Sequence, residues 1–175
     1  LTDDGNLYAG GTFANAGGFA VRNVARWDGT RWWPLGDGPA NGVNGPVEAI
    51  TVQGRDVYVA GGFSEAGGLS AARIAKWNGQ FWSPLANGSG NGVVGSVYSL
   101  ATDNTGVYVG GEFTGAGGLS VNNLAQWEFA LPPPRVVELR GQVTDDGLPL
   151  EGGLSAHWTK VNGPGEVTFA EPGKA

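Results

Sequence analysis

The sequence predicts an all-β fold in which one four-stranded antiparallel sheet is repeated along the chain. Two observations carry this prediction: a motif recurs at a fixed step of 50 residues, and each period divides into short apolar runs bounded by turn residues. A third observation agrees, since no segment shows the periodicity of an amphipathic helix over about ten residues. The chain has 175 residues and 41% hydrophobic content, which is enough to bury a core.

Aromatic residues and glycines define the repeat. Tyr8, Tyr58 and Tyr108 stand one step of 50 residues apart. The same step relates the following sets: Phe13, Phe63 and Phe113; Ala-Gly-Gly triplets that begin at Ala16, Ala66 and Ala116; Trp27, Trp77 and Trp127; Trp32 and Trp82; Asn41-Gly42-Val43 and Asn91-Gly92-Val93. A period of this length is typical of a solenoid, a propeller or another repeat array.

The clearest period contains four strand-like runs, 47–53, 56–63, 72–78 and 80–86. The first and third alternate apolar with polar residues, as half-buried strands do. Between the third and fourth stands Asn78-Gly79, matched by Asp28-Gly29, and both dipeptides are strong hairpin signals. Four antiparallel strands per repeat predict β-propeller blades, and three partial copies predict an incomplete ring.

Two sets of glycines recur with the motif. We expect Gly11, Gly61 and Gly111, in the double glycines that end the second run, to lie where the inner strands of neighbouring blades crowd together. The second set, Gly17-Gly18 and its copies, is predicted to supply positive φ in a connecting loop. A phosphate-binding loop is disfavoured because no Lys-Ser/Thr pair follows and no helix begins there.

The stretch YVAGGFSEAGG, followed by RIAKWNGQFWSPL, resembles the kelch-like propeller repeats of secreted bacterial proteins. The resemblance covers 1–127, although the interval from double glycine to tryptophan is longer than in the standard kelch motif. It implies a scaffold used in adhesion, in glycan binding and in some oxidases, and no single activity. In such a repeat Phe13, Phe63, Phe113 and the tryptophans at 27, 77 and 127 are expected to form the core between blades.

After Trp127 the repeat ends, which defines a propeller segment at 1–129. A proline-rich linker is predicted at 130–135. The segment 136–175 resembles the PKD-like, immunoglobulin-like modules of large bacterial surface proteins, which predicts a partial β-sandwich cut short at Ala175. Because the chain starts at Leu1 and has no methionine, we expect it to be an excised piece of a longer protein.

Composition and spacing disfavour several functional classes. The net charge of -6 disfavours nucleic acid, the absence of cysteine removes thiolate chemistry, and no apolar run is long enough to cross a membrane as a helix. The single histidine, His157, has no nucleophile or paired carboxylate nearby in sequence, and the pairs Asp3-Asp4 and Asp145-Asp146 are better explained as turns than as calcium ligands. We expect no metal, no cofactor and no catalysis within this chain.

Residues that break the repeat are the candidates for binding. Trp33 aligns with Ser83 and follows the repeated Trp32, so that the two indoles should face opposite sides of a strand, with Trp33 exposed. Arg31, which aligns with Phe81, flanks it. The pair could stack a sugar ring or dock a partner, or Trp33 could be covered by a neighbouring chain.

The resemblance implies a non-catalytic binding or structural segment of a secreted, multidomain surface protein, engaged in adhesion to a glycan or another surface protein. The alternative is an accessory region of an extracellular enzyme whose catalytic domain lies elsewhere. In either case the open blade faces are expected to pair with the remainder of the parent protein or with a second copy.

Overall fold

The computed structural model describes residues 5–87 and 90–129. This part of the chain is all-β, with several antiparallel sheets that do not close on themselves. The expected linker at 130–135 and module at 136–175, together with Asp3-Asp4, lie outside the described residues.

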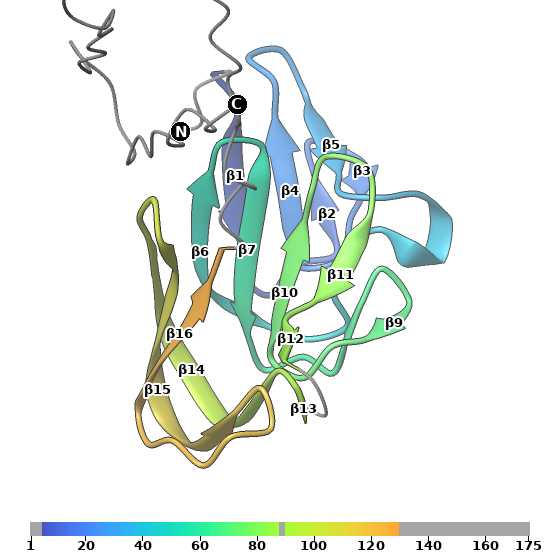
Figure 1. Ribbon diagram of the computed structural model, residues 1–175. Coiled ribbons are helices and arrows are strands. Elements are labelled where there is room, and N and C mark those ends of the chain that lie inside the picture. The colour runs from blue at the N-terminus through green and yellow to red at the C-terminus, as the bar shows by residue number, and fades with distance from the viewer. Residues whose placement is uncertain (1–4, 88–89, 130–175) are drawn as a thin grey trace, which may run out of the picture. The chain divides into compact units, whose positions relative to one another are not determined.

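The elements are short and follow one another closely (Figure 1). In chain order they are β1 (Leu7–Gly10), β2 (Asn15–Ala16), β3 (Phe19–Ala20), β4 (Val24–Trp27), β5 (Trp32–Pro34), the 3₁₀ helix η1 (Gly38–Ala40), β6 (Val47–Gln53), β7 (Asp56–Gly61), β8 (Glu65–Ala66), β9 (Leu69–Ser70), β10 (Ile74–Trp77), β11 (Trp82–Pro84), β12 (Ala86–Asn87), β13 (Gly90–Asn91), β14 (Val93–Thr102), β15 (Gly106–Ala116) and β16 (Leu124–Glu128).

Three main sheets correspond to three repeats, here numbered as the first (5–42), the second (43–92) and the third (93–129). The second repeat forms a four-stranded sheet in which β6, β7, β10 and β11 are neighbours in chain order, which confirms the four strands predicted for this period. The first repeat contributes a three-stranded sheet of β1, β4 and β5, and the third one of β14, β15 and β16.

An additional hairpin stands between the second and third strands of a repeat, and the sequence did not predict it. In the second repeat it is β8 paired with β9, and in the first it is β2 paired with β3. Gly67 and Gly68 form its two-residue turn with φ of 59° and 78°, which confirms positive φ for this glycine pair. The hairpin accounts for the long interval between double glycine and tryptophan.

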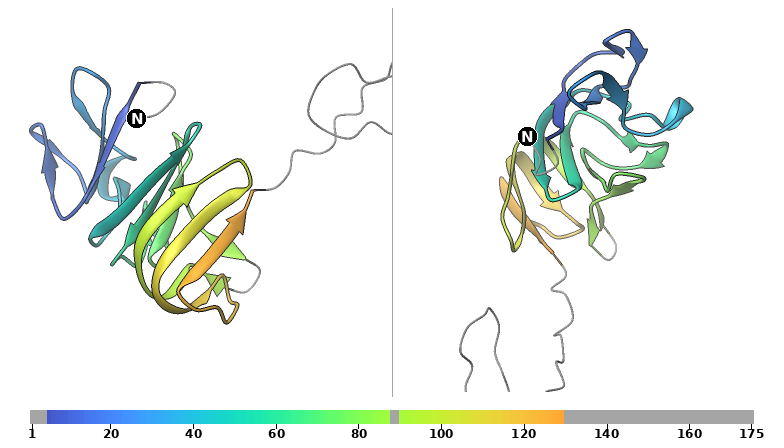
Figure 2. Two further views of the ribbon diagram at one scale, coloured as in Figure 1. Left: turned by 90° about the vertical axis from the view of Figure 1, so that its left-hand side faces the viewer. Right: turned by 90° about the horizontal axis from the view of Figure 1, so that it is seen from above.

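The second sheet is buried on both faces because it lies between the other two (Figure 2). Side chains alternate along β7: Val57 and Val59 enter the core shared with the first repeat, whereas Tyr58 and Ala60 enter the core shared with the third. The two cores are related by the 50-residue step, so that most members of one have a counterpart in the other. Each repeat therefore presents two different faces, and each face packs against the opposite face of its neighbour.

The recurrent double glycines allow two kinds of close approach. At Gly10 a Cβ would overlap Val47 of the second repeat, as expected from the sequence, whereas Gly61 and Gly111 approach backbone of their own sheet. A Cβ at Gly61 would overlap the carbonyl oxygen of Pro46, next to the bulge between Val47 and Ala49 in β6 of the same sheet. Gly111 stands in the same relation to the backbone at Ser96. The expected crowding against a neighbouring repeat is thus wrong for these two glycines, because a bulge within their own sheet makes the contact. A Cβ at Gly11 would meet only the ring of Phe13.

Burial of the repeated aromatic residues depends on their place in the array. Phe63 and Phe113 are buried, and Trp77 and Trp82 are only 8% and 5% exposed within the core between the first and second repeats. Trp127 packs against the second core and is half-buried. Phe13, Trp27 and Trp32 are half-buried, since no described repeat precedes them. The expected core positions are therefore most deeply buried where repeats pack on one another and less buried in the first repeat.

A short linker, Asn41 to Val43, joins the first repeat to the second and is hydrogen-bonded to both. The Val43 N–H donates to the carbonyl oxygen of Arg22 at 3.0 Å, and the Gly67 N–H of hairpin β8–β9 donates to that of Gly42 at 2.8 Å. The next linker, Asn91 to Val93, repeats the pattern. The Val93 N–H donates to the carbonyl oxygen of Ala72, and the Gly117 N–H donates to that of Gly92.

Candidate functional site

The hairpin of β4 and β5 carries the two binding residues proposed from the sequence, Arg31 in its turn and Trp33 in β5. Asp28 closes the turn by accepting hydrogen bonds at Oδ1 from Thr30 N–H (2.8 Å), Thr30 Oγ1 (2.7 Å) and Arg31 N–H (2.9 Å). Its other carboxylate oxygen accepts from the indole N–H of Trp33. The Arg31 guanidinium lies 3.4 Å from the centroid of the Trp33 ring, which is a close cation–π contact.

These hydrogen bonds stabilise the charged form of Asp28. They lower the pKa of its carboxyl group well below the usual range, chiefly through the Thr30 hydroxyl, then through the Arg31 N–H and the Trp33 indole. Asp28 therefore stays ionised at neutral pH and holds the indole in one orientation.

Trp33 lies on the face opposite Trp32, as expected, but it is half-buried where the sequence predicts an exposed side chain. The Arg31 side chain covers one face of the indole, and the carboxylate of Asp28 holds its N–H. The structure nevertheless brings Trp33 and Arg31 together as the sequence suggested.

Pairing across the first sheet places Trp33 in a row with two residues that the sequence did not indicate as binding residues. Tyr8 of β1 pairs with Arg26 of β4, and Arg26 pairs with Trp33 of β5, so that all three side chains project from one face. This face is the one directed toward the second repeat, because Tyr8 packs against the core between the two.

A groove of about 580 Å³ runs between this row and the second repeat. Tyr8, Arg26 and Trp33 line one side, and Arg55, Trp77 and Gln80 line the other, with Asp37 also in the wall. Aromatic surface, two guanidinium groups and an amide therefore meet in one depression.

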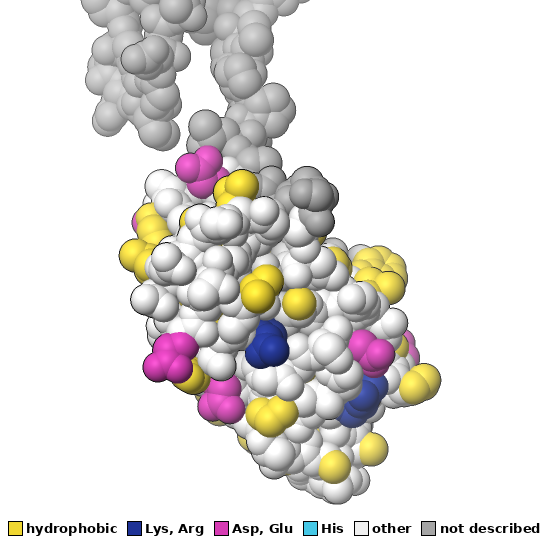
Figure 3. Space-filling model, turned by 90° about the horizontal axis from the view of Figure 1, so that it is seen from below, with side chains coloured by type: hydrophobic (Ala, Val, Ile, Leu, Met, Phe, Trp, Pro, Cys, Tyr) yellow, Lys and Arg dark blue, Asp and Glu magenta, His cyan; other side chains and the backbone are white. Residues whose placement is uncertain are grey.

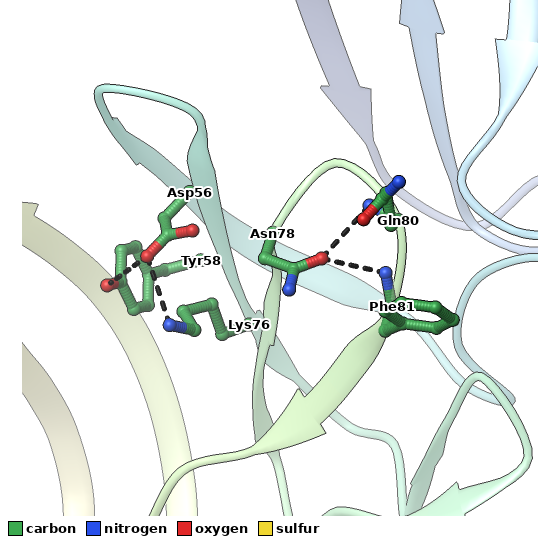
Figure 4. A network of polar contacts seen from close by, with 6 residues as sticks. All are labelled: Asp56, Tyr58, Lys76, Asn78, Gln80 and Phe81. Atoms are coloured by element: carbon green, nitrogen blue, oxygen red, sulfur yellow. Dashed lines mark hydrogen bonds and ion pairs between the residues drawn. The ribbon is translucent and has the colours of Figure 1, made fainter.

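A second groove, of about 490 Å³, occupies the same place between the second and third repeats. Its row is Tyr58, Lys76 and Ser83, each one 50-residue step from a member of the first row. In this row Asp56 forms an ion pair with Lys76, in which Asp56 Oδ2 lies 3.0 Å from Lys76 Nζ. The same oxygen lies 3.5 Å from the Tyr58 hydroxyl (Figure 4). Burial, and then the charge of Asp56, raise the pKa of Tyr58.

The two grooves differ in charge. Lys76–Asp56 is the only ion pair within residues 5–87 and 90–129, and Asn6 occupies in the first repeat the position that Asp56 has in the second. Arg26 and Arg55 accordingly make no ion pair with any described residue. Arg26 could have been found from the sequence, because it alternates with Trp27 as Trp33 does with Trp32.

The described residues offer no group of three or more His, Asp or Glu side chains that could hold a metal ion. His157 and Asp145-Asp146 lie outside them. Within the same residues no helix is long and apolar enough to span a bilayer.

Comparisons with known proteins leave the resemblance to kelch-like repeats and PKD-like modules to rest on the sequence motifs alone. No protein-family model matches the chain, and neither the curated proteins nor the solved structures contain a significant match.

Proposed function

We propose that the chain is a non-catalytic binding segment of an extracellular, multidomain surface protein, and that the groove between its first and second repeats binds an acidic carbohydrate. The observation that carries the proposal is the row of Tyr8, Arg26 and Trp33 facing Trp77 across this groove. Adhesion to a surface glycan is the corresponding biological role.

The composition of the groove suits a sugar that carries a carboxylate. Indole and phenol rings offer flat apolar surface with a polar group at one end, which suits the face and the hydroxyl groups of a pyranose. Arg26 and Arg55 supply planar donors that can bind a carboxylate through two parallel hydrogen bonds. Asp37 in the same wall can accept hydrogen bonds from hydroxyl groups.

Calorimetric titration with a galacturonic acid trisaccharide, compared with the neutral galactose trisaccharide, tests the proposal. We expect the acidic sugar to bind and the Arg26→Gln variant to bind it about tenfold more weakly, because one charged donor is lost. Trp33→Ser, which introduces the residue of the second groove, should weaken the binding of both sugars.

The matched control is Lys76→Gln, which removes the equivalent cation of the second groove. This variant should bind the acidic sugar as the parent chain does. Failure of both sugars to bind, or equal weakening by Lys76→Gln and Arg26→Gln, would exclude the first groove as the site.

We also propose that the three main sheets are blades of an open β-propeller. Support comes from the four-stranded antiparallel order of the second sheet and from the stacking of successive sheets face to face. A crystal structure of the chain tests this proposal: the inner strands of the three repeats should be arranged around a common axis, and a flat stack would contradict it.

A further inference from the structure

We infer that the two end faces of the array bind each other between copies, so that the chain associates head to tail with a second copy of itself. The leading face belongs to the first repeat and comprises Leu7, Phe13, Trp27 and Trp32. The trailing face belongs to the third repeat and centres on Tyr108 and Leu124. This inference concerns surfaces outside the groove and does not depend on the proposed function.

Equivalent positions of the repeat show what each end face lacks. Val57 and Val107 are 0% exposed at the two internal interfaces, whereas Leu7, at the same position of the first repeat, is 42% exposed. Val24 and Ile74 are likewise 0% exposed, whereas Leu124 is 67% exposed. Leu7 and Leu124 thus stand at positions that the fold buries wherever a neighbouring repeat is present.

Other apolar positions show that this exposure is not a general property of the repeat. Phe19, Leu69 and Leu119 occupy one position of the additional hairpin and are exposed in all three repeats, whether or not a neighbour is present. Figure 3 shows hydrophobic side chains in small separate spots over the face it draws, which is ordinary for a protein surface. The exposure of Leu7 and Leu124, in contrast, depends on a missing neighbour.

The two end faces are complementary to each other rather than to themselves. The leading face of the second repeat packs on the trailing face of the first, and the leading face of the third packs on the trailing face of the second. The contact between the leading face of one copy and the trailing face of another is therefore of the same kind as the two contacts between repeats within the chain. Such a contact is heterologous, in contrast to the symmetric contact of a two-fold dimer.

A polar group of the internal interface also recurs in the leading face. Across it the Trp82 indole N–H donates to the carbonyl oxygen of Leu35 at 2.7 Å. Trp32 has the equivalent indole in the leading face, and its N–H makes no hydrogen bond to the residues that the structure describes. The leading face therefore presents a donor as well as apolar surface to an incoming repeat.

The experiment is sedimentation of the full chain from low to high micromolar concentration, with Leu7→Asp and Leu124→Asp as variants. A carboxylate in either end face should weaken association by about tenfold or more, since the charge would be buried without a partner. Leu69→Asp is the matched control. Because Leu69 lies on the hairpin of the central repeat, outside both end faces, this substitution should leave the strength of association unchanged. Circular dichroism of each variant confirms that it is folded.

Mixing the two variants separates head-to-tail contact from the alternatives. Leu124→Asp keeps an intact leading face and Leu7→Asp keeps an intact trailing face, so that an equimolar mixture should form a one-to-one complex that neither variant forms alone. Three results would overturn the inference: a monomeric parent chain at every concentration, association of Leu7→Asp as strong as that of the parent, or a mixture of folded variants that stays monomeric.

Discussion

Gly61 and Gly11 occupy the same position of the repeat but have different neighbours. A Cβ at Gly61 would overlap the backbone of Pro46, whereas a Cβ at Gly11 would lie 3.3 Å from the Phe13 ring, which can shift. We predict that Gly61→Ala lowers the free energy of unfolding by about 3 kcal/mol, because backbone must move, and that Gly11→Ala changes it by less than about 1 kcal/mol. Urea denaturation measures both, and equal effects would contradict the bulge as the cause.

Asp28 makes stability depend on pH. Its pKa is lowered in the folded chain relative to the value of about 3.9 in an unfolded chain. The charged carboxylate therefore stabilises the fold above that value, and this contribution is lost as the pH falls through the lower pKa of the folded state. In urea denaturation, the stability of the parent relative to Asp28→Asn should be constant near neutral pH and should decline below about pH 4.

Asn78 shows why asparagine is the suitable replacement for Asp28. In the second repeat its Oδ1 accepts from the N–H groups of Gln80 and Phe81 at 2.9 and 2.8 Å, the same turn without a charge (Figure 4). Asp37→Asn serves as the control for the loss of one surface carboxylate. A decline below pH 4 that is identical in the parent and in Asp28→Asn would show that other groups are responsible.

At the level of elements, the hairpin of β8 and β9 is held by its contact with Trp82. A Cβ at Gly67 would lie 2.6 Å from Trp82 Cδ1, whereas one at Gly68 would meet nothing within 4 Å, although both residues have positive φ. We predict that Gly68→Ala costs about 1 kcal/mol, the cost of the left-handed backbone, and that Gly67→Ala costs about 1–3 kcal/mol more. Thermal denaturation of the two variants gives this difference, and equal losses would exclude packing on Trp82.

The main strands of the second repeat could be predicted from the sequence because apolar alternation and the Asn78-Gly79 turn mark them. Predicted runs 47–53 and 56–63 correspond to β6 and β7, with the second strand ending at Gly61. The hairpin of β8 and β9 was missed because strands of two residues carry no periodicity. Its Ala-Gly-Gly turn was visible, but a turn alone does not show that the flanking residues pair.

The candidate site could be predicted only in part. Trp33 and Arg31 stood out because they break the repeat, and the structure does bring them together. The predicted exposure of Trp33 was too high, because strand alternation gives no information on a side-chain contact such as the stacking of Arg31 on the indole. Tyr8 obeys the repeat, so that only the register across the sheet shows it to share a face with Trp33, whereas Arg26 could have been found from its alternation with Trp27.

For the whole molecule, the three sheets should differ in local stability. The second sheet is covered on both faces and the others on one face among the described repeats, and in repeat proteins stability follows from such nearest-neighbour interfaces. We predict that amide hydrogens of β7 and β10 exchange most slowly and that those of β1 and β4 exchange faster. Hydrogen exchange followed by mass spectrometry measures this, with the Leu124→Asp variant used so that end faces are not covered. Equal protection of the three sheets would indicate a single cooperative unit.

The linker from Asn41 to Val43 has a mechanical consequence. A pulling force along the chain passes from one sheet to the next through these residues, and the hydrogen bonds of Val43 to Arg22 and of Gly67 to Gly42 resist separation at that point. Since the next linker repeats the pattern, the boundaries between repeats bear load in series. Extension should therefore proceed by whole repeats, each 50-residue unit releasing about 170 Å of chain, so that the chain would lengthen in steps under shear.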